Sequence, residues 1–341
     1  MNNDRSTPVA SQDGHGQRVT ELLTADAGGL ARAADLLRLG RLVAFPTETV
    51  YGLGADATNP RAVAGIYAAK QRPSFNPLIS HLPDIAAAER EGVFDEDAMR
   101  LARAFWPGPL TLVVPRAETS HICDLATAGL DSVALRVPGL PLARDLLSLV
   151  GRPVAAPSAN RSGRVSPTRS DHVLADLIDR IDAVIDGGGT NVGLESTIVS
   201  CLNGEMRLLR PGGVPREAIE EVLGRTLLDG PASKDEEAPR APGMLESHYA
   251  PRALVRLAAD DVRPGEGALL FGSGRPRGIE GARAVRNLSE SGDLVEAAAN
   301  LFAYLRAIDD AGVEAIAVTP IPAHGLGEAI NDRLRRAAAP R

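Results

Sequence analysis

The sequence predicts an α/β protein with two domains. Segments typical of strands and helices alternate along the chain, which is the pattern of sheets covered by helices. A chain of 341 residues usually divides into more than one hydrophobic core, and a stretch rich in Pro and charge interrupts the alternation. We expect a disordered tail over residues 1–24, a larger domain over 25–226, a linker over 227–252 and a smaller domain over 253–341.

The larger domain begins with a short apolar strand at 42–45 and a helix at 59–70. Asn59 is a favourable N-cap for that helix, and Pro60 suits the first helical position. Runs rich in branched residues predict further strands at 76–82, 109–115, 132–138, 153–160, 182–189, 195–202 and 206–212. Apolar residues at helical spacing predict further helices at 95–106, 140–150, 170–178 and 214–224.

The same alternation restarts in the smaller domain. It predicts strands at 253–258, 267–272, 282–288 and 314–321. A long amphipathic helix is expected at 293–311, and a last one from about residue 327. The glycine-rich stretch "FGSGRPRG" at 271–278 follows a strand but lacks the G-x-G-x-x-G spacing, so it is a weak dinucleotide signal.

Composition argues against several classes of protein. A net charge of −7 argues against a surface made for the nucleic-acid backbone. Cys123 and Cys201 lack metal-ligand spacing and are expected to be buried thiols in a reducing compartment. No apolar run reaches the roughly 18 residues of a membrane helix, and the N-terminal stretch has no apolar signal core. We therefore expect a cytoplasmic protein without membrane association.

Polar side chains gather at the ends of the predicted strands. They are Thr47, Glu48, Thr49, His81, Arg136, Ser158, Asn160, Glu195, Ser196, Thr197 and Arg210. Any one of them could simply cap a helix or satisfy a loop amide. Ligands of open α/β sheets bind beyond the strand ends, so the set together predicts one concave site.

Cations near this predicted site favour a polyanionic ligand. The segments 57–83 and 152–170 contain basic residues but no Asp or Glu. Lys70 and Arg72 stand at an expected helix end before Asn76, where an ammonium beside a guanidinium suits a triphosphate. There is no Walker-type loop and no tight cluster of metal ligands. Any metal is therefore expected to be Mg²⁺ carried on nucleotide phosphates.

Seven blocks along the larger domain together resemble the threonylcarbamoyl-AMP synthases, the YrdC-domain enzymes. The blocks are "FPTETVYGLGADA", "KQRPSFNPLISH", "WPGPLT", "VALRVP", "APSANRSGRVSPT", "ESTIV" and "LLRPG". The stretch "APGMLESHYAPR" and the α/β domain after it resemble the long, two-domain form. The resemblance implies a YrdC-like twisted open sheet with a concave site, plus a smaller Rossmann-like α/β C-terminal domain.

That family makes L-threonylcarbamoyl-adenylate from L-threonine, bicarbonate and ATP and releases pyrophosphate. The product is the donor for threonylcarbamoyl modification of adenosine in tRNA, so the resemblance implies a tRNA threonylcarbamoyl-transfer machinery as the recipient. The implied threonine site is Thr49, His81, Arg136, Ser196 and the backbone at Ala156. The implied ATP site is Arg72, Asn76, Ser132, Ser158, Ser166, Arg210 and, from the linker, His248 and Tyr249.

The chemistry implied by the resemblance needs no enzyme nucleophile. The threonine amine forms a carbamate, whose oxygen attacks the α-phosphorus, so catalysis is positioning and charge neutralisation. Lys70 and Arg72, with Mg²⁺, are the residues expected to provide it. Two alternatives remain open from sequence: a carbamoyl-transfer domain of the hydrogenase-maturation type, and a module that binds double-stranded RNA or tRNA without adenylate chemistry. A monomer is the expected oligomeric state.

Overall fold

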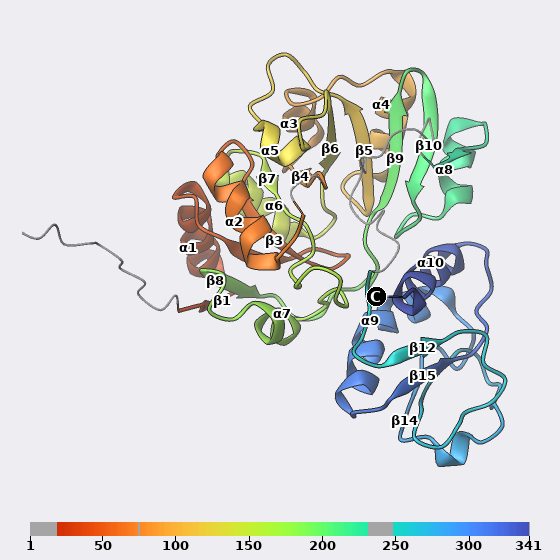
Figure 1. Cartoon of the computed structure of the whole chain (residues 1–341). Helices are drawn as coiled ribbons and strands as arrows, with labels where there is room; N and C mark the ends of the chain where they lie inside the picture. The colour runs from red at the N-terminus through yellow and green to blue at the C-terminus, as the bar shows by residue number, and fades with distance from the viewer. Residues whose placement is uncertain (1–18, 74–75, 231–247, 341) are drawn as a thin grey trace, which may run out of the picture.

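Two β-sheets with helices packed on them organise the chain (Figure 1). The structure is a computed structural model that describes residues 19–73, 76–230 and 248–340. The strands of the first domain are β1 (Glu21–Thr24), β2 (Val43–Pro46), β3 (Tyr51–Asp56), β4 (Ile79–His81), β5 (Leu110–Pro115), β6 (Ser132–Arg136), β7 (Val154–Ala155), β8 (Ala183–Asp186), β9 (Thr197–Leu202), β10 (Glu205–Arg210) and β11 (Leu228–Asp229). They form one open sheet of mixed direction in the order β1-β8-β2-β3-β7-β4-β6-β5-β9-β10-β11.

Helices cover this sheet, and most begin at a side-chain cap or at a proline. They are α1 (Ala27–Arg38), α2 (Pro60–Lys70), α3 (Ile85–Glu89), α4 (Glu96–Phe105), α5 (Asp124–Thr127), α6 (Pro141–Val150), α7 (Ser170–Leu177) and α8 (Arg216–Leu223). Asn59 caps α2 by accepting from the amides of Arg61 and Ala62, as the sequence predicts. Asp95 caps α4 in the same way through the amide of Ala98.

Strands β2 and β3 form a tight hairpin, whereas the sequence predicted only the first of these strands. The two strands pair antiparallel from Val43 opposite Gly54 to Pro46 opposite Tyr51, so only residues 47–50 form the turn. Gly54 is required here, because a Cβ at that position would lie 2.8 Å from the Phe45 ring. The glycines that resemble turn residues therefore allow close packing inside a fully buried strand.

Two boundary predictions are wrong. Residues 21–24, assigned from sequence to the tail, form β1, which pairs parallel with β8 and buries alternate side chains only partly. Residues 228–229, assigned to the linker, form β11 and pair parallel with β10. Both are short strands at the sheet edges, where one partner and partial burial are enough to hold a strand, so their sequences carry little apolar signal. The central linker residues 231–247 lie outside the described residues.

The second domain is a smaller, fully parallel α/β unit. Its strands are β12 (Leu254–Arg256), β13 (Gly267–Leu270), β14 (Ala284–Asn287) and β15 (Ala315–Val318), in the sheet order β12-β15-β13-β14. Its helices are η1 (Ile279–Gly281), α9 (Leu294–Asp310) and α10 (Leu326–Ala338). This is the Rossmann-like arrangement that the sequence predicts, with α9 capped by Asp293 through two amides.

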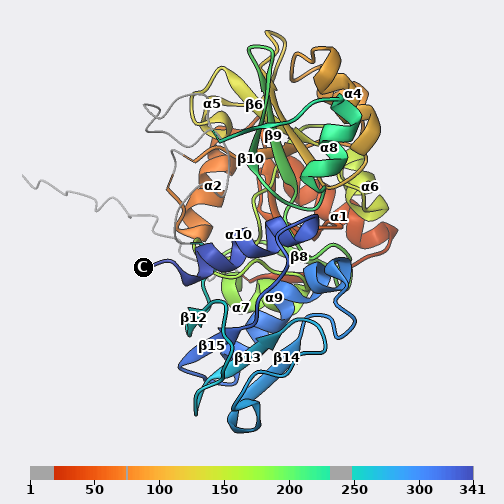
Figure 2. The same cartoon turned by 90° about the vertical axis from the view of Figure 1, so that its right-hand side faces the viewer.

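Helices α9 and α10 lie between the two sheets and dock the second domain against the first (Figure 2). Val50, Val165 and Leu194 of the first domain join the apolar core that α9 and α10 build. Gly193 lets the loop reach α9, because a Cβ there would lie 2.5 Å from backbone atoms of Ala298 and Ala299. The second domain thus packs against the loops that hold the candidate site.

Candidate active site

One cavity near the domain interface gathers polar residues from many separate segments. It is lined by Thr47, Thr49, Val50, Gly52, Arg72, Ile79, His81, Arg136, Ala156, Pro157, Ser158, Glu195, Ser196, Arg210, His248 and Tyr249. The predicted threonine site and most of the predicted ATP site therefore come together in space. The open volume is only about 40 Å³, enough for roughly three water molecules. A substrate must displace side chains or the segment that holds His248 in order to enter.

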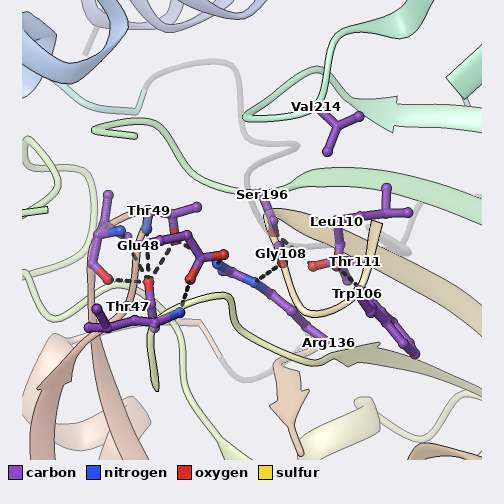
Figure 3. Close-up of polar contacts among 12 residues, drawn as sticks. Thr47, Glu48, Thr49, Trp106, Gly108, Leu110, Thr111, Arg136, Ser196 and Val214 are labelled. Atoms are coloured by element: carbon purple, nitrogen blue, oxygen red, sulfur yellow. Dashed lines mark hydrogen bonds and ion pairs between the residues drawn. The ribbon is translucent and has the colours of Figure 1, made fainter. Parts of the chain in front are cut away.

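Arg136 lines the cavity, and Figure 3 shows its guanidinium beside Glu48 and Gly108. It stands at the last position of β6 and is buried. Its Nη2 donates to Glu48 Oε1 at 2.7 Å and to Thr49 Oγ1 at 3.0 Å, and its Nε donates to the Gly108 carbonyl at 3.3 Å. These bonds fix the planar guanidinium, which suits a carboxylate ligand.

The hairpin turn explains why hydroxyl groups follow the first strand. Thr47 Oγ1 donates to the Val50 carbonyl at 2.7 Å and accepts from the amides of Thr49 and Val50. Thr47 and Thr49 also share a hydrogen bond between their hydroxyls at 2.8 Å. The Thr47 side chain thus satisfies the backbone groups of the turn. In this turn Glu48 and Thr49 both face Arg136 (Figure 3).

A second polar group consists of Thr111 on β5, Ser196 directly before β9 and Arg210 at the end of β10. Ser196 Oγ and Thr111 Oγ1 are 2.7 Å apart and share a hydrogen bond. Arg210 donates from Nη2 to the carbonyl oxygen of Ser196 at 2.8 Å and to its Oγ at 3.2 Å. Both serine and arginine are buried, so the cavity presents a hydroxyl and a cation side by side.

Lys70 does not line the cavity, although it was predicted to act in catalysis. Its Nζ donates to the carbonyl oxygens of Ser158 and Asn160, and the side chain is buried. Burial, reinforced by Arg72, lowers the pKa of the Lys70 amine well below its usual value. In this structure the amine anchors the loop that carries Ser158.

Arg72 does line the cavity. Gln71 is the C-cap of α2 and adopts the left-handed conformation, with φ of 54°, so the chain changes direction directly before Arg72. Its Nη2 donates to the Pro77 carbonyl at 3.4 Å, and its Nε is buried without a hydrogen-bond partner among the described residues. Burial lowers the pKa of this guanidinium to about 10, so it stays charged at neutral pH. A partly buried cation whose buried Nε has no partner among the described residues favours an anionic ligand.

Two histidines in the wall are neutral. Burial, then the nearby Arg136, lowers the pKa of His81 to about 3. Burial is also the main cause that lowers the pKa of His248 to about 3. In each ring Nδ1 is buried without a partner among the described residues. These rings can exchange hydrogen bonds with a ligand but carry no charge at neutral pH.

Three other predicted residues lie outside the cavity lining. Ser166 is buried and donates to Glu195 Oε1 at 2.5 Å, so it stands directly behind the wall. Asn76 is also buried, and its Oδ1 has no partner among the described residues. Ser132 starts β6, about 13 Å from Arg136 at ordinary strand spacing. A role for Ser132 would require a ligand that extends along β6.

No metal cage and no membrane helix are found in the parts of the chain that the structure describes. Among these residues no three His, Cys, Asp or Glu side chains are grouped as metal ligands would be. Within the same ranges no helix combines the length and apolarity needed to cross a bilayer. Glu195 lines the cavity, Glu48 contacts the lining residue Arg136, and each of these carboxylates pairs with an arginine.

Two family models match the chain, one in each domain. A family model named for Sua5, YciO and YrdC, described as "Telomere recombination", matches residues 35–212. A second model, described as the C-terminal domain of threonylcarbamoyl-AMP synthase, matches residues 214–339.

The chain belongs to the threonylcarbamoyl-AMP synthase family.

Curated members of the threonylcarbamoyl-AMP synthase family match the chain over nearly all of its length. The synthase of Bacillus subtilis is 42% identical over 335 residues, which span 95% of this chain and 96% of the relative. The synthase of Pyrococcus abyssi is 43% identical over 318 residues, which span 90% and 93%. The chain is therefore an enzyme of the nucleotidyltransferase type and has the two-domain form. The two alternatives left open by the sequence, a hydrogenase-maturation domain and an RNA-binding module, are not favoured.

Solved structures show the same fold. The crystal structure of P. abyssi Sua5 complexed with L-threonine matches with a TM-score of 0.85 at 40% identity, over 94% of this chain and 98% of that one. Escherichia coli YciO matches 57% of this chain and 95% of its own with a TM-score of 0.50 at 19% identity, which shows the fold alone.

Sequence reasoning did not assign three residues that shape this synthase-family site. Glu48 and Glu195 were noted at strand ends but were given no role, although each fixes a neighbouring cation or hydroxyl. Arg333 was not noted at all. It lies in a helix end with several arginines, "NDRLRRAAAP", where nothing in the pattern marks one of them as buried.

Proposed function

We propose that the chain converts L-threonine, bicarbonate and ATP into L-threonylcarbamoyl-AMP and pyrophosphate in the cavity around Arg136. One observation supports this assignment most strongly. Arg136, Thr49, Ser196, Arg72 and Arg210 come from five separate segments and line one cavity. That combination offers a fixed guanidinium for a carboxylate, hydroxyls for a hydroxyl and further cations for phosphates.

The amino acid binds at the Arg136 end. Its carboxylate pairs with the Arg136 guanidinium, which Glu48 and Thr49 hold in place. Its hydroxyl exchanges hydrogen bonds with the Thr49 or Ser196 hydroxyl, and its methyl group packs against apolar wall atoms such as those of Ile79. Valine would leave buried hydroxyls unpaired, so discrimination against it is strong.

The nucleotide binds at the Arg72 and Arg210 end, under the segment of His248 and Tyr249. The threonine amine adds to CO₂ derived from bicarbonate and loses a proton. The carbamate oxygen then attacks the α-phosphorus, and pyrophosphate leaves with the electron pair of the broken P–O bond. Arg72 and Arg210 stabilise the charge that develops on the phosphoryl oxygens. His81 and His248 are neutral and add no positive charge here, so the arginines provide it.

Mg²⁺ enters with ATP in this scheme and adds charge neutralisation at the phosphates. Glu48 and Glu195 are each paired with an arginine, which fits a metal brought in by the nucleotide. The product is a reactive mixed anhydride, and we infer that it passes to a separate tRNA threonylcarbamoyl-transfer machinery. We also infer that the enzyme acts as a monomer in the cytoplasm, which sedimentation and cell fractionation can test.

The assay is threonine-dependent release of pyrophosphate from ATP in the presence of bicarbonate. We expect release with L-threonine, much less with L-serine, and little with L-valine, for which discrimination should reach at least about 100-fold. Omitting bicarbonate is the control for uncoupled ATP hydrolysis. Equal release with threonine and valine, or release that needs no amino acid, would contradict the proposed function.

A further inference from the structure

Arg333 is a fully buried arginine in the second domain that reaches the wall of the active site. It lies on α10, and its side chain has no exposed surface. A guanidinium is rarely buried without partners, because removing it from water is costly. Its neighbours on the same helix, Arg335 and Arg336, are not fully buried.

Arg333 contacts two residues that line the cavity, Glu195 and Tyr249. Its Nε donates to Glu195 Oε2 at 2.9 Å, and its Nη1 donates to Asp332 Oδ2 at 2.7 Å. Its guanidinium carbon lies 5.1 Å from the centre of the Tyr249 ring, a cation–π contact. Glu195 and Tyr249 both line the cavity, and Tyr249 also stacks on Phe302 of α9. One side chain of the second domain thus contacts both.

Glu195 is the reason that this contact matters for the reaction. Its carboxylate is buried at a cavity that must accept the phosphates of a nucleotide, and an uncompensated negative charge there would repel them. Burial alone would raise the pKa of Glu195. The charges of Arg333 and Arg210 and a hydrogen bond from Ser166 outweigh burial and hold that pKa below its usual value. The group therefore remains an anion, and its charge requires a partner.

We propose that Arg333 is a positioning residue for the synthase reaction, which neutralises Glu195 and so keeps the cavity wall positive toward the nucleotide. The inference rests on the proposed function. It assigns to the second domain a direct part in nucleotide binding through α10. Arg333 does not touch the reacting atoms. It acts through Glu195 and through the ring of Tyr249.

The test compares Arg333→Gln, Glu195→Gln and the double variant by the KM values for ATP and threonine. We expect Arg333→Gln to raise the KM for ATP by roughly 10- to 100-fold, because it leaves a buried carboxylate unpaired beside the phosphate site. The KM for threonine should change by less than about threefold, because Arg136 and its partners are intact. In the double variant the KM for ATP should return to within about threefold of that of Glu195→Gln, because the uncompensated charge is gone.

Arg336→Gln is the matched control. Arg336 lies on the same helix and pairs with the same Asp332, but its Nε contacts this aspartate and not Glu195. We expect its KM for ATP to stay within about twofold of the wild-type value. A large rise in this control would show that any disturbance of α10 produces the effect, which would overturn the proposal.

Two further outcomes would overturn it. The loss caused by Arg333→Gln could be the same in the Glu195→Gln background, or the KM for threonine could rise as much as that for ATP. If Arg333→Gln alone does not fold, the comparison of Glu195→Gln with the double variant still decides, because neither leaves an unpaired carboxylate. Wild-type pyrophosphate release is measured first, so a failure of the proposed function is seen separately from a failure of this inference.

Discussion

Arg136 is the residue whose substitution should separate amino-acid binding from nucleotide binding. Glu48 and Thr49 hold its guanidinium in the cavity, so Arg136→Gln removes the carboxylate partner without changing the cations at the other end. We expect the KM for threonine to rise by about 100-fold, as for loss of a charge-assisted hydrogen bond. Threonine-dependent pyrophosphate release measures the effect. Arg116→Gln is the control, because Arg116 pairs with the exposed Asp124 away from the cavity. An unchanged KM for threonine would remove Arg136 from the amino-acid site.

Lys70 should be more important for stability than for the chemical step. Lys70→Met keeps an unbranched side chain that is one atom shorter, and it removes the amine that donates to the carbonyls of Ser158 and Asn160. We expect the free energy of unfolding in urea to fall by about 2–4 kcal/mol, because two buried acceptors lose their partner. A loss of kcat with unchanged unfolding free energy would instead support the catalytic role that the sequence suggested.

At the residue scale, the site could be predicted where a local motif carries the chemistry. Thr49, Arg136 and Ser196 each stand at a strand end, and the structure brings them to one cavity. The role of Lys70 could not be predicted, because the sequence does not reveal that its amine donates to two carbonyl groups of a loop far along the chain. The same holds for Arg333, since its partner Glu195 is 138 residues away.

At the element scale, the contact between the loop at Gly193 and helix α9 offers a test of domain docking. Gly193→Ala would place a Cβ 2.5 Å from the α9 backbone, at a φ of 72° that alanine adopts poorly. We expect the unfolding free energy to fall by about 2–4 kcal/mol and the KM for ATP to rise, because α9 must move away from the site. Urea unfolding and the pyrophosphate assay measure the two effects.

Gly188→Ala is the matched control for that variant. Gly188 has a φ of 79°, but no heavy atom lies within 4 Å of its virtual Cβ. In Gly188→Ala the free energy of unfolding should therefore fall by only about 1 kcal/mol, from backbone strain, and the KM for ATP should stay at the wild-type value. Equal effects of the two substitutions would argue against a steric contact with α9.

Elements with strong local signals were predicted well, and elements held by their neighbours were not. Asn59, Pro60 and the apolar spacing gave α2, and Asp293 gave the start of α9. Strand β3 was missed because Gly52 and Gly54 are turn residues by propensity, whereas here they allow close packing inside the sheet. Strand β1 was missed because a short edge strand needs only one partner, which lies far along the chain in β8.

At the scale of the whole molecule, the two neutral histidines predict how stability depends on pH. Each has a folded pKa of about 3, below the usual 6.5 or so of an unfolded chain, so the unfolded state binds these protons first. The stabilisation is present above about pH 6.5 and is lost as the pH falls toward 3. The free energy of unfolding in urea should be lower at pH 4.5 than at pH 7.5 by roughly 3 kcal/mol for each histidine.

His248→Gln isolates one of the two contributions. This variant should lose less unfolding free energy than the wild-type chain between pH 7.5 and pH 4.5, because one group that binds a proton on unfolding is gone. Exposed His324 provides the control through His324→Gln. Identical pH dependence in the wild-type chain and in His248→Gln would show that this imidazole titrates normally.

The side chains of Val50, Val165 and Leu194 belong to the first domain by sequence and to the second core by packing. If the two domains were separated, these three side chains would be exposed and the core of the second domain would lose part of its packing. Calorimetry of the full chain should therefore record a single unfolding transition. A fragment that ends at residue 230 should unfold at a lower temperature and bind apolar dyes at the exposed aliphatic surface.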